Sequence, residues 1–130
     1  MNLLLDTHTF LWFIGGDSQL DPYARQLIEA PGNQRYLSIA SVWEITIKSS
    51  LGRLTVPMPP GTLIRDHVWA NAIELLTITP DQLDVLHTLP YHHNDPFDRL
   101  LIAQAISEEL TIITKDRFFD AYSVQVNWSL

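Results

Sequence analysis

The stretch that decides the fold is MNLLLDTHTF, residues 1–10, in which three consecutive leucines lead directly into Asp6. A continuous apolar run without polar alternation is typical of a strand that is buried on both faces, as in a parallel sheet. Residues 7–14, which follow, have the pattern of a short helix. The chain therefore begins with a buried strand, an acidic residue at the end of that strand, and a helix.

The same order of strand and helix recurs along the rest of the chain. We expect further strands at residues 35–39, 74–79 and 111–114, and a short edge strand at 123–126. We expect helices at 21–30, 41–51, 62–72, 79–89 and 95–109. Because no two strands are close enough for a tight hairpin, the pattern predicts an α/β fold with a central parallel sheet of four to five strands flanked by helices. The order of the strands is left open.

Composition and length favour one ordinary globular domain. The chain has 130 residues, of which 46% are hydrophobic, and it contains no repeat or Ser/Gly linker. We therefore expect a single domain over residues 1–130. Charged residues make up 18% of the chain, against an ordinary fraction of about 25%. This shortfall is a weak indication of a covered subunit or partner surface.

The charge balance and the absence of cysteine exclude several classes of site. Eight Lys and Arg against fifteen Asp and Glu give a formal charge of −7, which argues against a broad basic face for nucleic acid. A phosphate substrate would need another cation, and a divalent metal is the obvious candidate. Without cysteine there is no disulfide, zinc–thiolate site or thiol nucleophile. The N-terminal apolar run is too short for a signal peptide or a membrane span, so we expect a cytoplasmic protein without a membrane partner.

Four carboxylates fall where the expected strands end or the expected helices begin. Asp6 ends the first strand, and Asp116 follows the strand at 111–114. Glu44 lies near the start of the helix at 41–51, and Asp98 near the start of the helix at 95–109. Ligands of open α/β sheets bind at the carboxyl ends of the strands, and a helix that leads into a parallel strand starts at that same edge. The four residues are therefore expected to meet at one edge of the sheet.

Each carboxylate also has a purely structural interpretation. Ser41 and Glu44 have the spacing of a capping box, and Glu44 has the spacing of a helical ion pair with Lys48. Asp98 suits the positive end of a helix dipole, and Asp116 could cap a short turn. Against this, Asp98 heads a stripe that should face the sheet and be buried, formed with Leu101, Ile102 and Ala105. A buried carboxylate is costly unless it is paired or binds a metal.

Taken together, the four acids favour a metal site. Four carboxylates at one edge would repel one another unless some were protonated or a cation lay between them. Oxygen ligands of this kind suit Mg²⁺ or Mn²⁺. We therefore expect Asp6, Glu44, Asp98 and Asp116 to be both metal ligands and catalytic residues.

Other polar and aromatic residues carry weaker signals. His92 and His93 precede Asp95 in a polar loop, where hydrogen bonding or substrate contact near the site is expected rather than metal ligation. Arg99 could meet a phosphate, although a surface ion pair is the simpler expectation. His8 is close enough to Asp6 to support it or else is exposed. Three tryptophans at helical positions are expected to be core or interface residues rather than base-stacking surfaces: Trp12, Trp43 and Trp69.

Four segments resemble those of PIN domains, and more narrowly those of VapC-type ribonuclease toxins. The segments are LLLDTHTFLW at 3–12, SVWEITIK at 41–48, HNDPFDRLLIAQA at 93–105 and ITKD at 113–116. The resemblance covers essentially the whole chain in the right order. Carried over by position, it assigns the acidic site to Asp6, Glu44, Asp98 and Asp116, and it adds Asp95, which we assign mainly to helix capping.

The resemblance implies a three-layer sandwich with a Mg²⁺ or Mn²⁺ site and endonucleolytic cleavage of RNA. It also implies a toxin that is commonly a homodimer and is neutralised by a cognate antitoxin protein. Hydrolysis in this family would leave a 5′-phosphate and a 3′-hydroxyl. The RNA target, the antitoxin and the number of metal ions are left open.

The alternative is a non-catalytic module that binds metal and phosphate, either PIN-like or receiver-like. A receiver domain also places acids at the ends of parallel strands, but it needs a phosphate-accepting Asp at the end of its central strand. The third expected strand ends in Thr77-Ile78-Thr79, without an acid. This absence argues against the receiver-like version.

Overall fold

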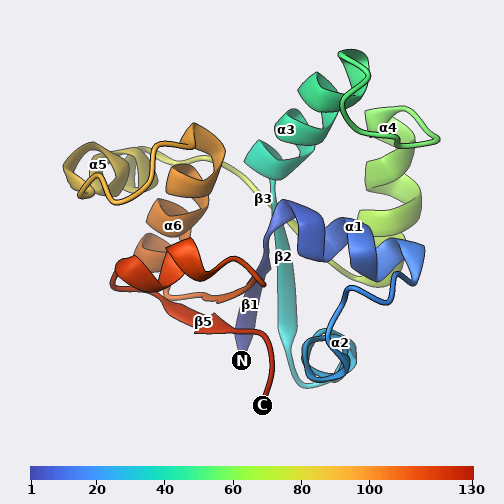
Figure 1. Ribbon diagram of the computed structural model, residues 1–130, viewed down its shortest axis with the longest axis horizontal. Helices are drawn as coiled ribbons and strands as arrows, with labels where there is room; N and C mark the ends of the chain where they lie inside the picture. Colours follow the sequence, from blue (N-terminus) through green and yellow to red (C-terminus); the bar gives the residue numbers. More distant parts are fainter.

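The computed structural model describes residues 1–130 and confirms the parallel α/β fold. Five strands form one sheet in the order β3-β2-β1-β4-β5, and every neighbouring pair is parallel. The strands are β1 Asn2–Leu5, β2 Gln34–Ser38, β3 Glu74–Leu76, β4 Thr111–Ile113 and β5 Gln125–Asn127. In Figure 1 the helices lie on both sides of the sheet, so the molecule has three layers.

Two apolar cores cover the two faces of the sheet. On one face, Leu3 and Leu5 of β1 pack with residues of α1 Thr7–Gly15, α2 Pro22–Glu29, α3 Ile39–Ser50 and α4 Pro60–Leu63. On the other face, Leu4 packs with α5 Pro80–Thr88, with α6 Pro96–Glu108 and with the 3₁₀ turn η3 Arg117–Ala121. All three leucines are fully buried, as their unbroken apolar run predicts.

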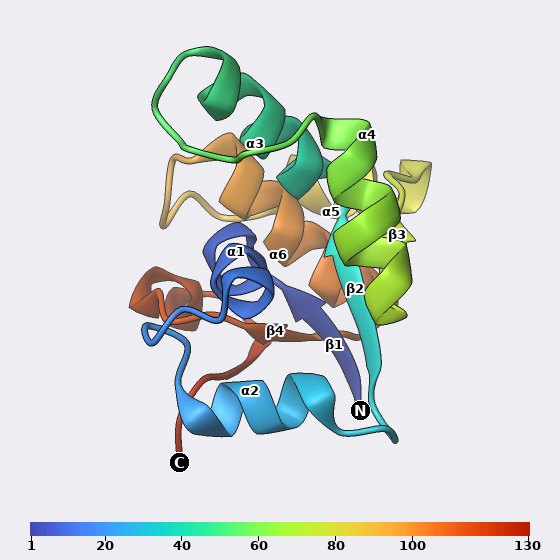
Figure 2. The ribbon, with the colours of Figure 1, turned by 90° about the vertical axis from the view of Figure 1, so that its right-hand side faces the viewer.

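The strand order locates the edge where a ligand is expected. The chain moves outward from β1 to β2 and β3, and then returns to the other side of β1 to form β4 and β5. The carboxyl ends of β1 and β4 therefore flank the point where the order reverses, which is where open α/β sheets bind ligands. Both termini lie in the lower part of Figure 2, the N-terminus before the amino end of β1 and the C-terminus after the carboxyl end of β5.

The same strand order overturns the receiver-like alternative. Receiver domains have the order 2-1-3-4-5, in which the third strand is central. In this chain β3 is an edge strand and β1 is the central one. The residue that follows β3 therefore does not bear on the receiver-like alternative. The strand order is what separates this fold from a receiver domain.

Two helical segments differ from the sequence prediction. The helix α3 begins at Ile39 rather than at Ser41, because the Ser38 hydroxyl accepts a hydrogen bond from the backbone N–H of Ala40 and caps it. The segment predicted as one helix at 62–72 consists of the short α4, the π-helical η1 Ile64–Val68 and the 3₁₀ turn η2 Trp69–Asn71. The wider π turn brings Leu63 and Val68, both fully buried, toward the same side.

None of the helices is both long enough and apolar enough to cross a membrane.

Candidate active site

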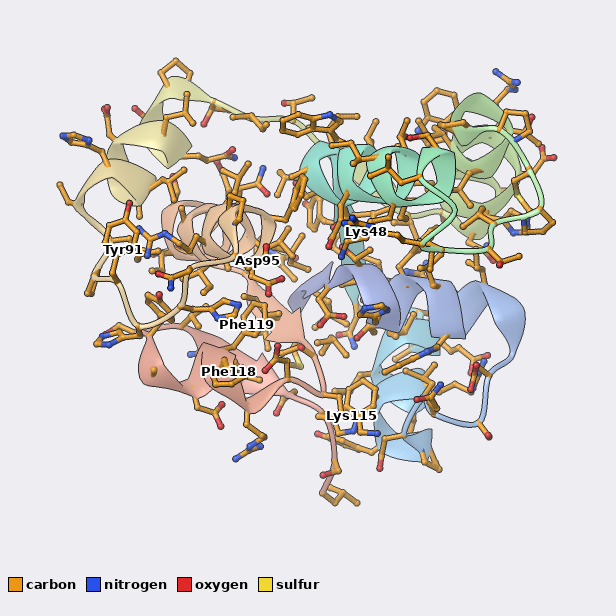
Figure 3. All side chains as sticks on the ribbon, turned by 45° about the horizontal axis from the view of Figure 1, so that its top comes forward. Lys48, Tyr91, Asp95, Lys115, Phe118 and Phe119 are labelled. Atoms are coloured by element: carbon orange, nitrogen blue, oxygen red, sulfur yellow. The ribbon has the colours of Figure 1, made fainter.

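A cavity of about 310 Å³ opens at the carboxyl edge of the sheet, and only one of the residues around it is hydrophobic. The structure brings all four predicted acids to it. The ten lining residues are Asp6, Thr7, His8, Trp12, Glu44, Lys48, Asp95, Asp98, Lys115 and Asp116. In Figure 3 Lys48, Asp95 and Lys115 surround the centre of the view, and they come from α3, the start of α6 and the segment after β4.

Asp6 is held between the end of β1 and the start of α1. One carboxylate oxygen accepts a hydrogen bond of 2.8 Å from the backbone N–H of Thr9 and caps α1. The other accepts a hydrogen bond from the hydroxyl of Thr114, just beyond β4. Burial raises the pKa of Asp6, and the hydrogen bonds from Thr114 and Thr9 offset only part of this rise. A nearby cation would favour the ionised form.

Glu44 does not cap a helix, so the predicted capping box with Ser41 is wrong. Because α3 begins at Ile39, Glu44 lies in its second turn, and its side chain is buried over the cavity. It accepts a hydrogen bond of 2.6 Å from the hydroxyl of Thr7. The predicted ion pair with Lys48 is confirmed, with 2.6 Å between Nζ and Oε2.

Asp98 lies in the first turn of α6, at the head of the buried stripe that the sequence predicted. Its carboxylate lies 2.9 Å from Nε2 of His93. Burial raises the pKa of Asp98 to about 6, and the negative charges of Asp95 and Glu44 add to the rise, while the contact with His93 opposes it. The charges of these three acids therefore act on one another across the cavity.

Asp95 and Asp116 both cap helical turns and both line the cavity. Asp95 accepts hydrogen bonds from the backbone N–H groups of Phe97 and Asp98, which confirms its capping role for α6. Asp116 accepts one of 2.9 Å from the backbone N–H of Phe118 and caps η3. The capping interpretation of Asp116 is therefore correct, and it coexists with a position at the cavity.

The acids share a cavity, but they do not form a coordination sphere as they lie here. No three Asp, Glu or His side chains are close enough together to bind one ion. Instead, the carboxylates are bound by backbone N–H groups, hydroxyls, an ammonium group and an imidazole. The donor set still fits a hard divalent cation, since carboxylate oxygens are its preferred ligands and Lys48 already neutralises part of the charge. A shared ion would require the side chains to move closer together.

Sequence reasoning missed the two threonines that hold the acids, Thr7 and Thr114. Their positions give a usable signal, because Thr7 directly follows Asp6 and Thr114 directly follows β4. A hydroxyl beside a buried carboxylate can donate a hydrogen bond that keeps it in place. The hydrogen-bonding role expected for the histidine pair is observed for His93. His8 is exposed and stacks on Trp12 at the edge of the cavity.

Arg99 does not form the surface ion pair that the sequence analysis expected. Its side chain is buried, and it donates hydrogen bonds to the carbonyl oxygens of Leu89 and Pro90 and to the hydroxyl of Tyr122. The guanidinium carbon also lies 3.7 Å from the centre of the Tyr91 ring. Arg99 therefore stabilises the loop between α5 and α6, which contains His93. It does not line the cavity.

Of the three tryptophans expected in the core or at an interface, only Trp12 packs against the core. Trp12 is half-buried against the first core and also lines the cavity. Trp43 and Trp69 are both more than half exposed, so neither is a core residue. An interface role for these two residues stays a prediction.

Comparison with known proteins identifies the family. The PIN domain family matches residues 3–124. The chain is 28% identical over 116 residues to ribonuclease VapC22 of Mycobacterium tuberculosis, covering 88% of this chain and 87% of that protein.

Solved structures show the same fold at low sequence identity. The structure of VapBC2 from Rickettsia felis bound to a promoter DNA fragment contains a chain with a TM-score of 0.74 and 15% identity, covering 98% of this chain and 99% of that one. VapBC-1 from nontypeable Haemophilus influenzae gives a TM-score of 0.69 and 16% identity, covering 98% and 97%. With the family match over nearly the whole chain, the protein belongs to the PIN domain family.

Proposed function

We propose that this chain is a metal-dependent endoribonuclease of the VapC type, the toxin of a toxin–antitoxin pair, and that residues 1–130 form its single domain. The observation that carries the proposal is the cavity that gathers carboxylates from four distant segments of the chain. Membership of the PIN family and similarity to a protein named ribonuclease VapC22 support the same activity.

Asp6, Glu44 and Asp98 are the proposed principal ligands of a Mg²⁺ or Mn²⁺ ion, and Asp116 holds a second ion or orients the attacking water. All four line the cavity, and their oxygens suit either metal. When bound, such an ion polarises the scissile phosphate and lowers the pKa of a water molecule. Hydrolysis of the RNA would break the P–O3′ bond: water supplies the oxygen that joins phosphorus and a proton for O3′, which leaves a 5′-phosphate and a 3′-hydroxyl.

The chain's own residues position the acids for this reaction. The hydroxyl of Thr114 holds one oxygen of Asp6, whose other oxygen accepts from Thr9. The hydroxyl of Thr7 holds one oxygen of Glu44, whose other oxygen is paired with Lys48. An oxygen has two lone pairs, so each carboxylate could still bind a cation. Asp98 is held by its contact with Nε2 of His93. Burial, and then the charges of Asp95 and Glu44, raise the pKa of Asp98, and positive charge in the cavity would favour its ionised form.

The proposed partners are an RNA substrate, a cognate antitoxin protein and a second copy of the chain, in the cytoplasm. Several similar solved structures are VapBC or toxin–antitoxin complexes, including one from Klebsiella pneumoniae, which supports an antitoxin partner. The low charged fraction of the sequence is consistent with a covered surface.

The test is cleavage of total RNA by the purified chain with Mn²⁺, compared with the variants Asp6→Asn and Asp98→Asn. Mapping of 5′-phosphate ends should reveal sites that only the parent protein produces, and neither variant should inhibit growth when expressed. Asp81→Asn, which changes an exposed acid in the first turn of α5, serves as the matched control and should cleave like the parent. Unchanged cleavage by both cavity variants would refute the proposed site.

A further inference from the structure

We propose that the exposed ring of Phe118 is a stacking surface for a nucleobase of single-stranded RNA, next to the acidic cavity. The proposal deepens the function given above and rests on it. It names a residue that contacts the substrate, and it explains how an acidic protein can hold a polyanion.

The side chain of Phe118 is exposed although it lies in an ordered turn. Its exposed fraction is 64%, whereas the next residue, Phe119, is 1% exposed and belongs to the second core. The turn η3 therefore uses one phenylalanine to anchor itself and presents the other to solvent (Figure 3). Single exposed rings are common on protein surfaces, so it is the position of this ring beside His93 and Asp116, and not its exposure alone, that points to a ligand.

Two contacts link Phe118 to residues of the cavity, one through its backbone and one through its ring and His93. The backbone N–H of Phe118 donates a hydrogen bond to Asp116. One face of the ring is stacked on His93, with 5.3 Å between ring centres and 11° between planes. The same His93 contacts Asp98 through Nε2. Because His93 covers one face of the ring, a base would stack on the other face, outside the cavity and two positions along the chain from Asp116.

His93, which supports the ring of Phe118, lies on a hydrogen-bonded loop, and this lowers the entropy cost of binding a base. His93 lies on the loop that Arg99 fastens by hydrogen bonds to Leu89 and Pro90. The backbone N–H of His92 donates a further hydrogen bond to the hydroxyl of Tyr122. The stacked pair is thus already formed in the free protein, and a base gains contact area without ordering new side chains.

The charge around the cavity explains why stacking is needed. Five carboxylates and two lysines line it, so with all acids ionised even a bound divalent cation leaves the cavity negative. The whole chain carries a formal charge of −7. Cation–phosphate contacts therefore supply little affinity. Base–aromatic stacking contributes about 1–3 kcal/mol per base without requiring positive charge, and it favours single strands because duplex bases are already stacked.

The experiment measures the binding of a short fluorescent single-stranded RNA with Mn²⁺, in an Asp6→Asn background that prevents cleavage. Asp6 forms hydrogen bonds with Thr9 and Thr114, and not with Phe118 or His93. The Asp6→Asn substitution should therefore leave the stacked Phe118 ring in place. Phe118→Leu should weaken binding about 5- to 150-fold, since each 1.4 kcal/mol of lost stacking corresponds to a factor of about ten. Phe118→Trp should bind within about threefold of the parent ring, because stacking is retained. The control Trp69→Leu removes a ring of 58% exposure that is not part of the cavity and should leave binding unchanged.

Abasic nucleotides locate the base. One abasic position in the RNA should weaken binding to the Phe118 protein by a similar factor, and the same substitution should have no further effect on the Phe118→Leu protein. Equal binding by Phe118→Leu and the parent overturns the stacking proposal. So does a change of oligomeric state in Phe118→Leu at unchanged RNA affinity, because the ring would then belong to a protein interface. Failure of the proposed ribonuclease activity is recognised separately, by the absence of new 5′-phosphate ends.

Discussion

The ammonium group of Lys48 lies 2.6 Å from Oε2 of Glu44, within the cavity that contains the other acids. The two residues are one helical turn apart on α3, so the ion pair forms without help from the rest of the fold. The hydrogen bond to Glu44, supported by the negative charges of Glu44, Asp95 and Asp98, raises the pKa of Lys48 against the opposing effect of burial. Lys48 therefore acts as an internal cation at the place where we propose a metal ion.

Replacing Lys48 by Met should strengthen the binding of Mn²⁺. The lysine side chain is 40% exposed, and exposed pairs are worth less than about 1 kcal/mol, so the gain should not exceed about fivefold. Isothermal titration calorimetry measures this directly. Arg53→Met, which removes an exposed cation outside the cavity, should not change the affinity. Weaker Mn²⁺ binding in Lys48→Met would contradict the competition between the ammonium and the metal.

The raised pKa of Asp98 predicts a pH dependence of stability in metal-free protein. Because the folded-state pKa is about 6 and the ordinary value is 3.8, the folded protein holds a proton on Asp98 that the unfolded chain has already released. The free energy of unfolding contributed by Asp98 is highest below pH 4 and falls as the pH rises to about 6. The loss should be no more than about 3 kcal/mol.

Urea unfolding of the parent and of Asp98→Asn between pH 4 and pH 7.5 isolates this contribution, because Asn does not titrate. The parent should lose stability relative to the variant over that range when EDTA is present, and Mn²⁺ should restore it by favouring the ionised form. Parallel curves for the two proteins without metal would show that Asp98 is not strained by its surroundings.

Thr114→Val should impair the site more than the fold. The hydroxyl of Thr114 donates to Asp6 and accepts from the backbone N–H of Asp116, so its loss leaves polar groups from two proposed ligands unpartnered. We expect a loss of about 1–3 kcal/mol in unfolding free energy and at least a tenfold lower cleavage rate. Thr114→Ser should recover both.

Thr111→Val is the matched comparison for Thr114→Val. Thr111 is likewise a buried threonine and lies in β4, but its hydroxyl donates to Gln125, which does not line the cavity. This variant should lose stability and keep its cleavage rate. A parallel loss of rate in both variants would mean that general destabilisation, and not the position of Asp6, determines activity.

Arg99→Met should loosen the loop between α5 and α6. The variant keeps much of the buried volume but loses hydrogen bonds to two carbonyl oxygens and to Tyr122, which we expect to cost about 2–4 kcal/mol. Hydrogen exchange should become faster in residues 89–95. Arg65→Met, which changes an exposed arginine of η1, should leave that loop protected.

Sequence alone located the acids but not all of their partners. The triple leucine run, the Thr79 capping box and the Asp95-Pro96 start are local signals, and each corresponds to an element of the structure. Asp6, Glu44, Asp98 and Asp116 line the cavity that parallel topology predicts. Local signals suffice here because helix starts and buried strands are encoded within a few neighbouring residues.

The tertiary structure alone decided the strand order, the π turn after Leu63 and the partners of the acids. Thr7 reaches Glu44 across 37 positions, and Thr114 reaches Asp6 across 108. The exposure of Phe118 beside the buried Phe119 depends in the same way on what packs around η3. Periodicity describes which side of an element faces the core, whereas these contacts depend on which elements lie next to each other, and that is set by the packing of the whole chain.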